Sequence, residues 1–182
     1  INQNGWVWKL GMNLTHYKNK VTDLPLKDMP QSGVNKLQVG RSVYDFYMIE
    51  WAGVDPENGD PLWYMDEEDE NHNPTGKRVT TNDYGSADYY YVNKSSLPKV
   101  YGGFNTSLSW KGFDLSAIFA YSIGGYIYNR DITMILHNGS LEGRDWSTEI
   151  LKRWTPDNRN TDVPVLSTRL LPVFCRIIRI CD

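Results

Sequence analysis

The chain has 182 residues, a formal net charge of −3, 40% hydrophobic and 13% aromatic residues, and a mean hydropathy of −0.53. It is long enough to build a domain with its own core. No apolar run approaches the ~20 residues that a membrane-spanning helix needs, and the negative charge argues against a nucleic-acid partner. The chain opens on Ile1 rather than Met, so we expect a piece of a longer protein.

The first predicted element is a β-strand over residues 6–14. Apolar side chains occupy every second position, which places them on one face of a strand. Its length matches a strand that crosses a bilayer at a tilt, about 9–11 residues. The alternating apolar positions are Trp6, Trp8, Leu10, Met12 and Leu14.

Residues 16–98 form a long polar insert with strand-like runs at 43–51 and 62–65. Loops this long are unusual in compact soluble domains, whereas outer-membrane barrels have long extracellular loops. The acidic run at 66–70 either binds a hard cation or is a solvated loop. The insert's aromatic side chains either contact a substrate or partner or fold the insert on itself: Trp63, Tyr64, Tyr84, Tyr89, Tyr90 and Tyr91.

A hairpin over residues 99–123 is the most informative pattern in the chain. Both arms alternate, and Lys111-Gly112 forms the turn between them. Trp110 and Phe113 flank that turn on the apolar face, where the aromatic girdle of a transmembrane barrel lies. With Trp6 and Trp8 at the matching end of the first strand, we predict a membrane-facing girdle of Trp6, Trp8, Trp110 and Phe113. A soluble β-sandwich also alternates in this way.

Two segments follow the hairpin. Residues 129–164 are predicted to form a second extracellular loop with a short helix near 146–154, where Trp146, Ile150 and Trp154 share a face. Residues 170–182 form an atypical tail that contains both cysteines, and we expect it to result from a frameshift or truncation. Residues 1–169 are therefore assigned to the barrel segment. The predicted fold class is all-β: antiparallel hairpins from a transmembrane barrel, with a long extracellular insert and a short loop helix.

Several segments resemble the SusC/RagA-type TonB-dependent transporters of the outer membrane, and they occur in the order of that family. They are VGRS at 39–42, AGVDP at 52–56 with GDP at 59–61, LPKVYGGFN at 97–105 with WKGFDL at 110–115, GGYIYN at 124–129, and RWTP at 153–156 with TDVP at 161–164.

The resemblance implies a barrel segment from the C-terminal third of a much larger transporter in the Gram-negative outer membrane. Such transporters import glycans, peptides or other large nutrients. They work with a SusD-like surface lipoprotein and draw energy from TonB, whose contacts would lie in the missing N-terminal part. This segment would contribute strands facing outer-membrane lipid and loops that touch the substrate or the lid. The strand edges of such a fragment would have no partners, so we expect that the isolated fragment can oligomerise.

No catalytic, metal or cofactor site is expected. His16, His72 and His137 are scattered without the spacing of metal ligands, and no phosphate-binding glycine loop occurs. The protein is therefore not predicted to be an enzyme. The alternative function is a secreted or surface β-sandwich that binds glycans, in which a second sheet would bury Leu108, Trp110, Phe113 and Leu115. The identity of the substrate stays open.

Overall fold

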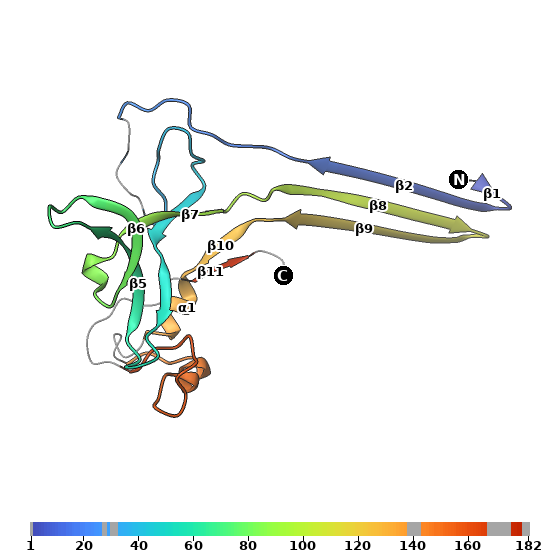
Figure 1. The fold of residues 1–182 in the computed structure, drawn as a ribbon. Coiled ribbons are helices and arrows are strands. Elements are labelled where there is room, and N and C mark those ends of the chain that lie inside the picture. The colour runs from blue at the N-terminus through green and yellow to red at the C-terminus, as the bar shows by residue number, and fades with distance from the viewer. Residues whose placement is uncertain (1, 27–28, 30–32, 138–142, 167–175, 180–182) are drawn as a thin grey trace.

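The computed structural model describes residues 2–26, 29, 33–137, 143–166 and 176–179. Figure 1 shows a long narrow sheet that projects from a group of shorter strands and helical turns. We call the long sheet the arm; it contains β1 (Asn2–Gln3), β2 (Trp6–Thr15), β8 (Val100–Trp110) and β9 (Phe113–Ile123). The remaining described residues form the head. The predicted all-β, antiparallel class is confirmed.

The arm is one continuous antiparallel ladder. β2 pairs with β8 at ten positions from Trp6↔Trp110 to Thr15↔Tyr101. β8 pairs with β9 at eleven positions, from Trp110↔Phe113 to Val100↔Ile123. The strand predicted over residues 6–14 and the hairpin predicted over 99–123 are therefore confirmed, and they are neighbours in a single sheet.

Both strand connections at the far tip of the arm are two-residue turns. Asn4 and Gly5 have φ angles of 52° and 80°, and Lys111 and Gly112 have φ angles of 47° and 85°. Two consecutive positive φ values define a type I′ turn, whose twist matches the twist of the strands that it joins. All longer connections leave the arm at its other end, beside the head (Figure 1).

The head contains two small sheets from the long insert. β3 (Asp45–Ile49) pairs with β7 (Tyr89–Ser95), and β4 (Trp51–Val54), β5 (Pro61–Glu68) and β6 (Pro74–Thr81) form the other sheet. The strand-like runs predicted at 43–51 and 62–65 correspond to β3, β4 and β5. The 3-10 helix η1 (Tyr84–Ser86) connects β6 to β7.

The chain beyond the arm adds short elements to the head. β10 (Tyr126–Asn129) leads into α1 (Arg130–Ile135), whose first turn is capped by the side chain of Asn129. The predicted loop helix near 146–154 lies where the structure has a 3-10 helix, η2 (Thr148–Lys152). In the tail, β11 (Arg176–Arg179) pairs with β10, while the two cysteines lie outside the described residues.

The buried apolar core lies in the head. Among the described residues, the buried hydrophobic side chains are Phe46, Met48, Ile49, Trp63, Leu136 and Ile150, and none belongs to the arm. The described helices are all too short to span a bilayer. The arm is therefore a sheet without a core of its own.

Candidate functional site

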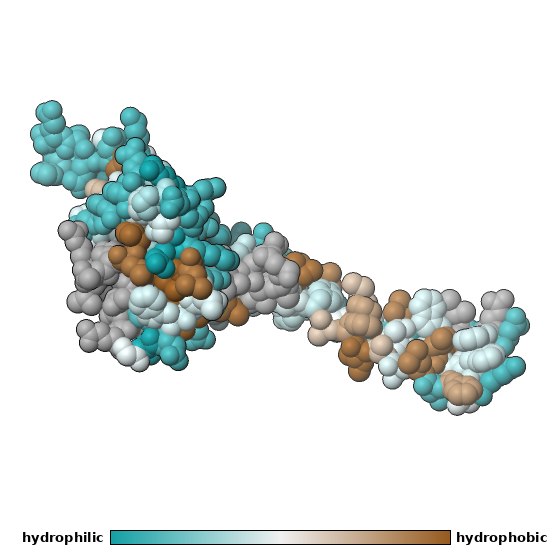
Figure 2. Space-filling view, turned by 90° about the horizontal axis from the view of Figure 1, so that it is seen from below, coloured by the Kyte–Doolittle hydropathy of each residue, from teal (hydrophilic) through white to brown (hydrophobic). Residues whose placement is uncertain are grey.

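One face of the arm is apolar along its whole length. Residues paired across antiparallel strands point to the same side of the sheet, so the register sets the membership of each face. The apolar face consists of Trp6, Trp8, Leu10, Met12 and Leu14 on β2, Val100, Gly102, Phe104, Thr106, Leu108 and Trp110 on β8, and Phe113, Leu115, Ala117, Phe119, Tyr121 and Ile123 on β9. Figure 2 shows brown and pale side chains extending along the arm.

No described segment covers this face. Met12 is 70% exposed, Phe113 76% and Leu115 69%. Isolated exposed apolar residues are ordinary, but a continuous face of them marks an interaction surface. In a β-sandwich a second sheet would bury Phe113 and Leu115, and the described part of the chain supplies none.

Three polar groups on the apolar face are satisfied within the sheet. The indole N–H of Trp8 donates a hydrogen bond to Thr106 Oγ1 at 2.8 Å. The Tyr121 hydroxyl reaches across β8 and donates to the Asn13 carbonyl at 2.9 Å. Gly102 permits this reach, because a Cβ there would collide with the Asn13 carbonyl and lie 2.7 Å from the Tyr121 hydroxyl. The side chains of Trp8, Thr106 and Tyr121 therefore have hydrogen-bond partners within the sheet.

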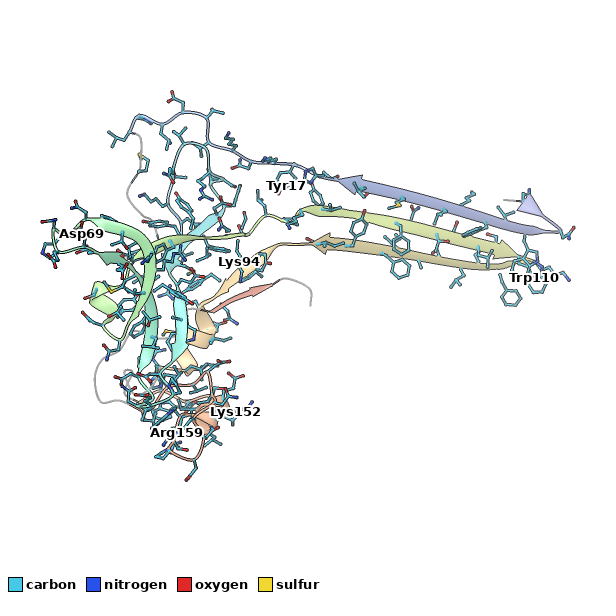
Figure 3. All side chains as sticks on the ribbon, in the orientation of Figure 1. Tyr17, Asp69, Lys94, Trp110, Lys152 and Arg159 are labelled. Carbon is cyan, nitrogen blue, oxygen red and sulfur yellow. The ribbon has the colours of Figure 1, made fainter. Side chains whose placement is uncertain are left out.

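The predicted girdle residues gather at the far tip of the arm. Trp6 and Trp110 stack with ring centroids 4.7 Å apart and an interplanar angle of 12°. Phe113 pairs with Trp110 across the turn, and Trp8 follows one pair further along the same face. Figure 3 places Trp110 at this tip and Tyr17 where the arm meets the head. Their role as a membrane girdle stays a prediction.

The opposite face of the arm is mostly polar or small. Its members are Val7, Lys9, Gly11, Asn13 and Thr15 on β2, Tyr101, Gly103, Asn105, Ser107 and Ser109 on β8, and Asp114, Ser116, Ile118, Ala120 and Ser122 on β9. Ile118 is the main exception and is 86% exposed. A sheet with one apolar and one polar face can separate a hydrocarbon phase from an aqueous one.

The predicted contact aromatics of the insert pack mainly within the head. Trp63 is only 4% exposed and contacts the ring of Tyr84 edge to face, with centroids 5.3 Å apart. Tyr89 and Tyr91 both lie against Tyr47, at 5.7 and 4.8 Å. These contacts support the interpretation that the aromatic residues fold the insert on itself.

Tyr90 contacts the acidic run, and Tyr64 precedes that run in β5. The Tyr90 hydroxyl donates to Asp66 Oδ1 at 2.8 Å, and the Arg78 guanidinium lies 3.8 Å from the ring centroid. Burial, reinforced by the hydrogen bond to Asp66, raises the pKa of Tyr90 above its ordinary value. Tyr64 is half-buried, and Tyr89 keeps the largest exposed fraction of the predicted set, at 43%.

The acidic run forms the end of β5 and the turn into β6. Asp69 Oδ1 accepts hydrogen bonds from the backbone N–H groups of Asn73 and Asn71, at 2.9 and 2.8 Å. These two bonds, that of Asn73 first, lower the pKa of Asp69. Glu68 pairs with His72 at 3.1 Å. The described residues contain no group of three His, Cys, Asp or Glu side chains arranged to hold a metal.

Two distant motifs named in the sequence analysis meet in the head. The ring of Trp154 lies directly on Gly59, in the turn between β4 and β5. Its indole N–H donates to the Pro56 carbonyl at 3.2 Å, and the Val165 N–H donates to the Gly59 carbonyl at 2.9 Å. The turn at 55–60 is therefore fastened to residues 154–165.

No family model matches the chain. Among curated proteins, the chain is 26% identical over 192 residues to TonB-dependent receptor P3 of Formosa agariphila, covering 98% of the chain and 19% of the receptor. It is 28% identical over 178 residues to TonB-dependent receptor P26 of the same organism, covering 90% and 17%. The chain thus spans less than a fifth of the length of these relatives.

Solved structures give the same result. The RagAB peptide transporter matches with a TM-score of 0.78 and 32% identity, over 91% of this chain and 18% of that chain. The RagAB peptide importer in its open-open state matches with a TM-score of 0.78 and 30% identity, over 96% and 19%. The resemblance seen in the sequence is confirmed: this chain is similar in sequence and in fold to a segment of RagA-type TonB-dependent transporters.

Proposed function

We propose that this chain supplies wall strands and surface loops to an outer-membrane transporter that imports peptides, glycans or other large nutrients. The carrying observation is the apolar face of the arm, which no described segment covers and on which Trp8, Thr106 and Tyr121 form their side-chain hydrogen bonds within the sheet. The similarity of the chain to TonB-dependent receptors and to RagAB supports a role in transport rather than in catalysis. We assign no bond-making or bond-breaking role to any residue.

The dimensions of the arm suit a bilayer. β8 and β9 each contain 11 residues, and a strand rises about 3.3 Å per residue, so each is about 36 Å long. Tilted by about 45°, such a strand spans about 25 Å, which is the height of the apolar band on transmembrane barrels. A polar group without a hydrogen-bond partner in hydrocarbon costs several kcal/mol. The hydrogen bonds of Trp8 and Tyr121 within the sheet avoid that cost and therefore fit a bilayer.

The connections suggest an orientation. Bacterial outer-membrane barrels have short periplasmic turns and long extracellular loops. We therefore place the tip with its two type I′ turns, and the girdle of Trp6, Trp8, Trp110 and Phe113, at the periplasmic side. Residues 16–98 and 129–164 then lie outside the cell. There they are available to a substrate or to a SusD-like surface lipoprotein, while TonB would act through other parts of the transporter.

Adjacent cysteines on β9 test whether the apolar face meets lipid. Leu115 lies on the apolar face of β9 and Ser116 on the opposite face, and both side chains are exposed in the structure. The two variants are Leu115→Cys and Ser116→Cys. Each is made with Cys175 and Cys181 replaced by Ser, and the chain is placed in phospholipid vesicles. A membrane-impermeant maleimide should label Ser116→Cys and spare Leu115→Cys, because a thiol in hydrocarbon does not ionise to the reactive thiolate. Leu115→Cys should become labelled once the vesicles are dissolved and the chain is unfolded.

Equal labelling of the two sites by the impermeant reagent would contradict the membrane role. Size-exclusion chromatography with light scattering provides the second measurement. We expect the chain to need detergent or to self-associate, because its apolar face and strand edges have no partners among the described residues. A compact monomer without detergent, with Leu115→Cys protected, would instead favour the soluble glycan-binding sandwich.

A further inference from the structure

A cavity lined by several charged side chains lies where the arm joins the head. Its volume is 390 Å³, within the range of roughly 300–1,000 Å³ that small-molecule sites occupy, and its walls come from the segments at 16–20, 40–45 and 95–99. We call it the junction cavity. Its lining includes five charged side chains and one histidine: Lys18, Lys20, Arg41, Asp45, Lys99 and His16.

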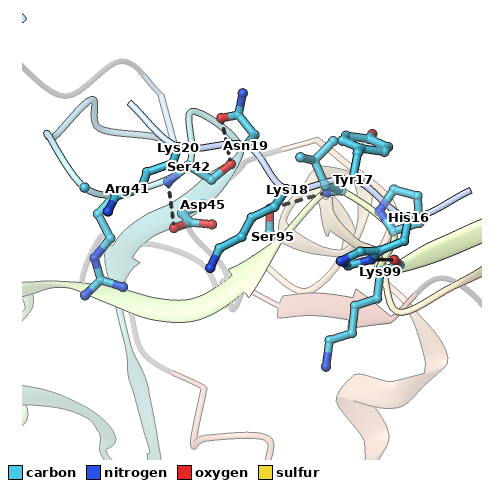
Figure 4. Close-up of a pocket in the computed structure, with 13 residues that line it drawn as sticks. His16, Tyr17, Lys18, Asn19, Lys20, Arg41, Ser42, Asp45, Ser95 and Lys99 are labelled. Carbon is cyan, nitrogen blue, oxygen red and sulfur yellow. Dashed lines mark hydrogen bonds between the residues drawn. The ribbon is translucent and has the colours of Figure 1, made fainter. Parts of the chain in front are cut away.

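The junction cavity carries an excess of positive charge in a chain that is negative overall. It contains three lysines and one arginine against a single carboxylate, that of Asp45, whereas the whole chain has a net charge of −3. Among the described residues, no carboxylate forms an ion pair with Lys18, Lys20, Arg41 or Lys99. Figure 4 shows Lys18, Arg41 and Lys99 extending to the same side from three separate segments. Neighbouring like charges repel each other, so an anion among them would relieve that repulsion.

Hydrogen bonds hold the walls of the cavity together. Residues 19–21 are tied to residues 40–43, because Val21 N–H donates to the Arg41 carbonyl at 2.8 Å and Asn19 Oδ1 accepts from Ser42 Oγ at 3.1 Å. His16 Nδ1 lies 2.5 Å from the Lys99 carbonyl, across the end of β2 and β8. The cavity is therefore formed before any ligand arrives.

Arg41 is also oriented in advance. Its Nη1 donates to Asn93 Oδ1 at 3.2 Å, and its guanidinium lies 4.5 Å from the ring centroid of Tyr91. A guanidinium has five N–H donors in a fixed fork, so one hydrogen bond leaves the others for a ligand. A fixed fork combined with mobile lysine point charges suits a phosphate oxyanion, which accepts hydrogen bonds from several directions.

We propose that the junction cavity binds a phosphate-class oxyanion. Two sources share this chemistry: a phosphate in a lipid headgroup and a soluble phosphate. The cavity begins two residues beyond Leu14, the last apolar-face residue of β2, and so lies next to the end of the apolar face. If the apolar face lies in the bilayer, basic side chains at the end of that face lie at the depth of the lipid phosphates and can bind them.

The first experiment measures the affinity for inorganic phosphate by isothermal titration calorimetry, with the whole chain in detergent solution at low salt. The test variant is Lys18→Gln/Lys99→Gln. The matched control is Lys77→Gln/Lys152→Gln, which removes the same charge at two exposed lysines outside the cavity. We expect the test variant to bind phosphate at least about tenfold more weakly and the control to change by less than about twofold, because the Coulomb energy falls with distance and the control lysines lie outside the cavity. No bilayer is involved, so this result is independent of the proposed membrane role.

The second experiment identifies the source of the phosphate. The chain is placed in phosphatidylcholine vesicles with spin-labelled phosphatidic acid or spin-labelled phosphatidylcholine, and the immobilised fraction of each lipid is measured. A preference for phosphatidic acid that Lys18→Gln/Lys99→Gln abolishes identifies a lipid headgroup. Phosphate binding without that preference identifies a soluble anion. The proposal is overturned if the test and control variants behave alike in both experiments, or if the unsubstituted chain binds neither ligand.

Discussion

Replacing Gly59 by Ala should open the contact between the turn at 55–60 and residues 154–165. A Cβ at Gly59 would lie 2.6 Å from Cδ2, 2.7 Å from Cε3 and 2.9 Å from Cγ of Trp154. The ring cannot swing away freely, because its indole N–H donates to the Pro56 carbonyl and the Trp154 backbone N–H donates to the Val163 carbonyl at 2.8 Å. Extra atoms forced into a packed contact destabilise it by about 1–3 kcal/mol.

Gly76→Ala is a matched control for this substitution. Gly59 and Gly76 both have a φ angle of 80°, but a Cβ at Gly76 has nothing within 4 Å. The backbone penalty for a side chain at positive φ, about 1–2 kcal/mol, is thus common to both variants. The difference between them isolates the contact with Trp154.

Hydrogen exchange of the Val165 amide, which donates to the Gly59 carbonyl, measures the opening directly. A packing term of about 1–3 kcal/mol corresponds to exchange roughly 5- to 150-fold faster in Gly59→Ala than in Gly76→Ala. Gly76→Ala should change the Val165 rate by no more than the shared backbone penalty allows, because β6 makes no part of this contact. The reasoning is refuted if the two variants accelerate Val165 exchange equally.

Two further substitutions test the arm and the acidic turn. Thr106→Val removes the acceptor of the Trp8 indole N–H. In vesicles this substitution should lower the free energy of unfolding by about 1–3 kcal/mol, as measured by urea titration of tryptophan fluorescence. Thr106→Ser keeps the hydroxyl and should retain most of the stability of the unsubstituted chain. Because the pKa of Asp69 lies below its ordinary 3.8, its carboxylate stabilises the turn above that pH and stops doing so as the pH falls through the lowered value. The amide shifts of Asn71 and Asn73 should follow that midpoint below pH 3.8, and Asp69→Asn should abolish the titration; a midpoint at or above 3.8 would contradict the hydrogen-bond assignment.

The arm could be predicted from the sequence because its signals are local. A period of two over ten residues fixes both the strand and its faces, and Lys111-Gly112 fixes the register of the hairpin through its turn. The pairing of β2 with β8 is non-local. The sequence predicts only that the tryptophans lie at matching ends, and the structure adds the pairing and stacks Trp6 on Trp110.

The head could be predicted only in part because its order comes from partners far along the chain. β6 is almost wholly exposed and therefore shows no apolar alternation. β7 begins with three consecutive tyrosines, and only the fold reveals that Tyr90 meets Asp66 while Tyr89 and Tyr91 meet Tyr47. An exposed strand and an aromatic run both lack the periodicity on which sequence reasoning depends.

The junction cavity escaped the sequence analysis for a related reason. Lys18, Arg41 and Lys99 are separated by 23 residues or more in the chain, and each is an ordinary surface residue in its own segment. Only the ladder between β2 and β8, together with the hydrogen bonds between 19–21 and 40–43, brings them to one place. A charge run would have been visible in the sequence, whereas a charge cluster assembled by strand pairing is not.

The two parts of the chain make opposite demands on their surroundings. The head buries its own apolar residues, among them Phe46 and Trp63, so water can cover the rest of it. The arm exposes a continuous apolar face, and within the described residues β9 has no strand beyond it and β2 has only the two residues of β1. Unpaired edges are satisfied by further strands and an apolar face by hydrocarbon. A larger barrel in a membrane would supply both, which is why the exposed face and the unpaired edges of the arm favour the proposed function over a soluble sheet.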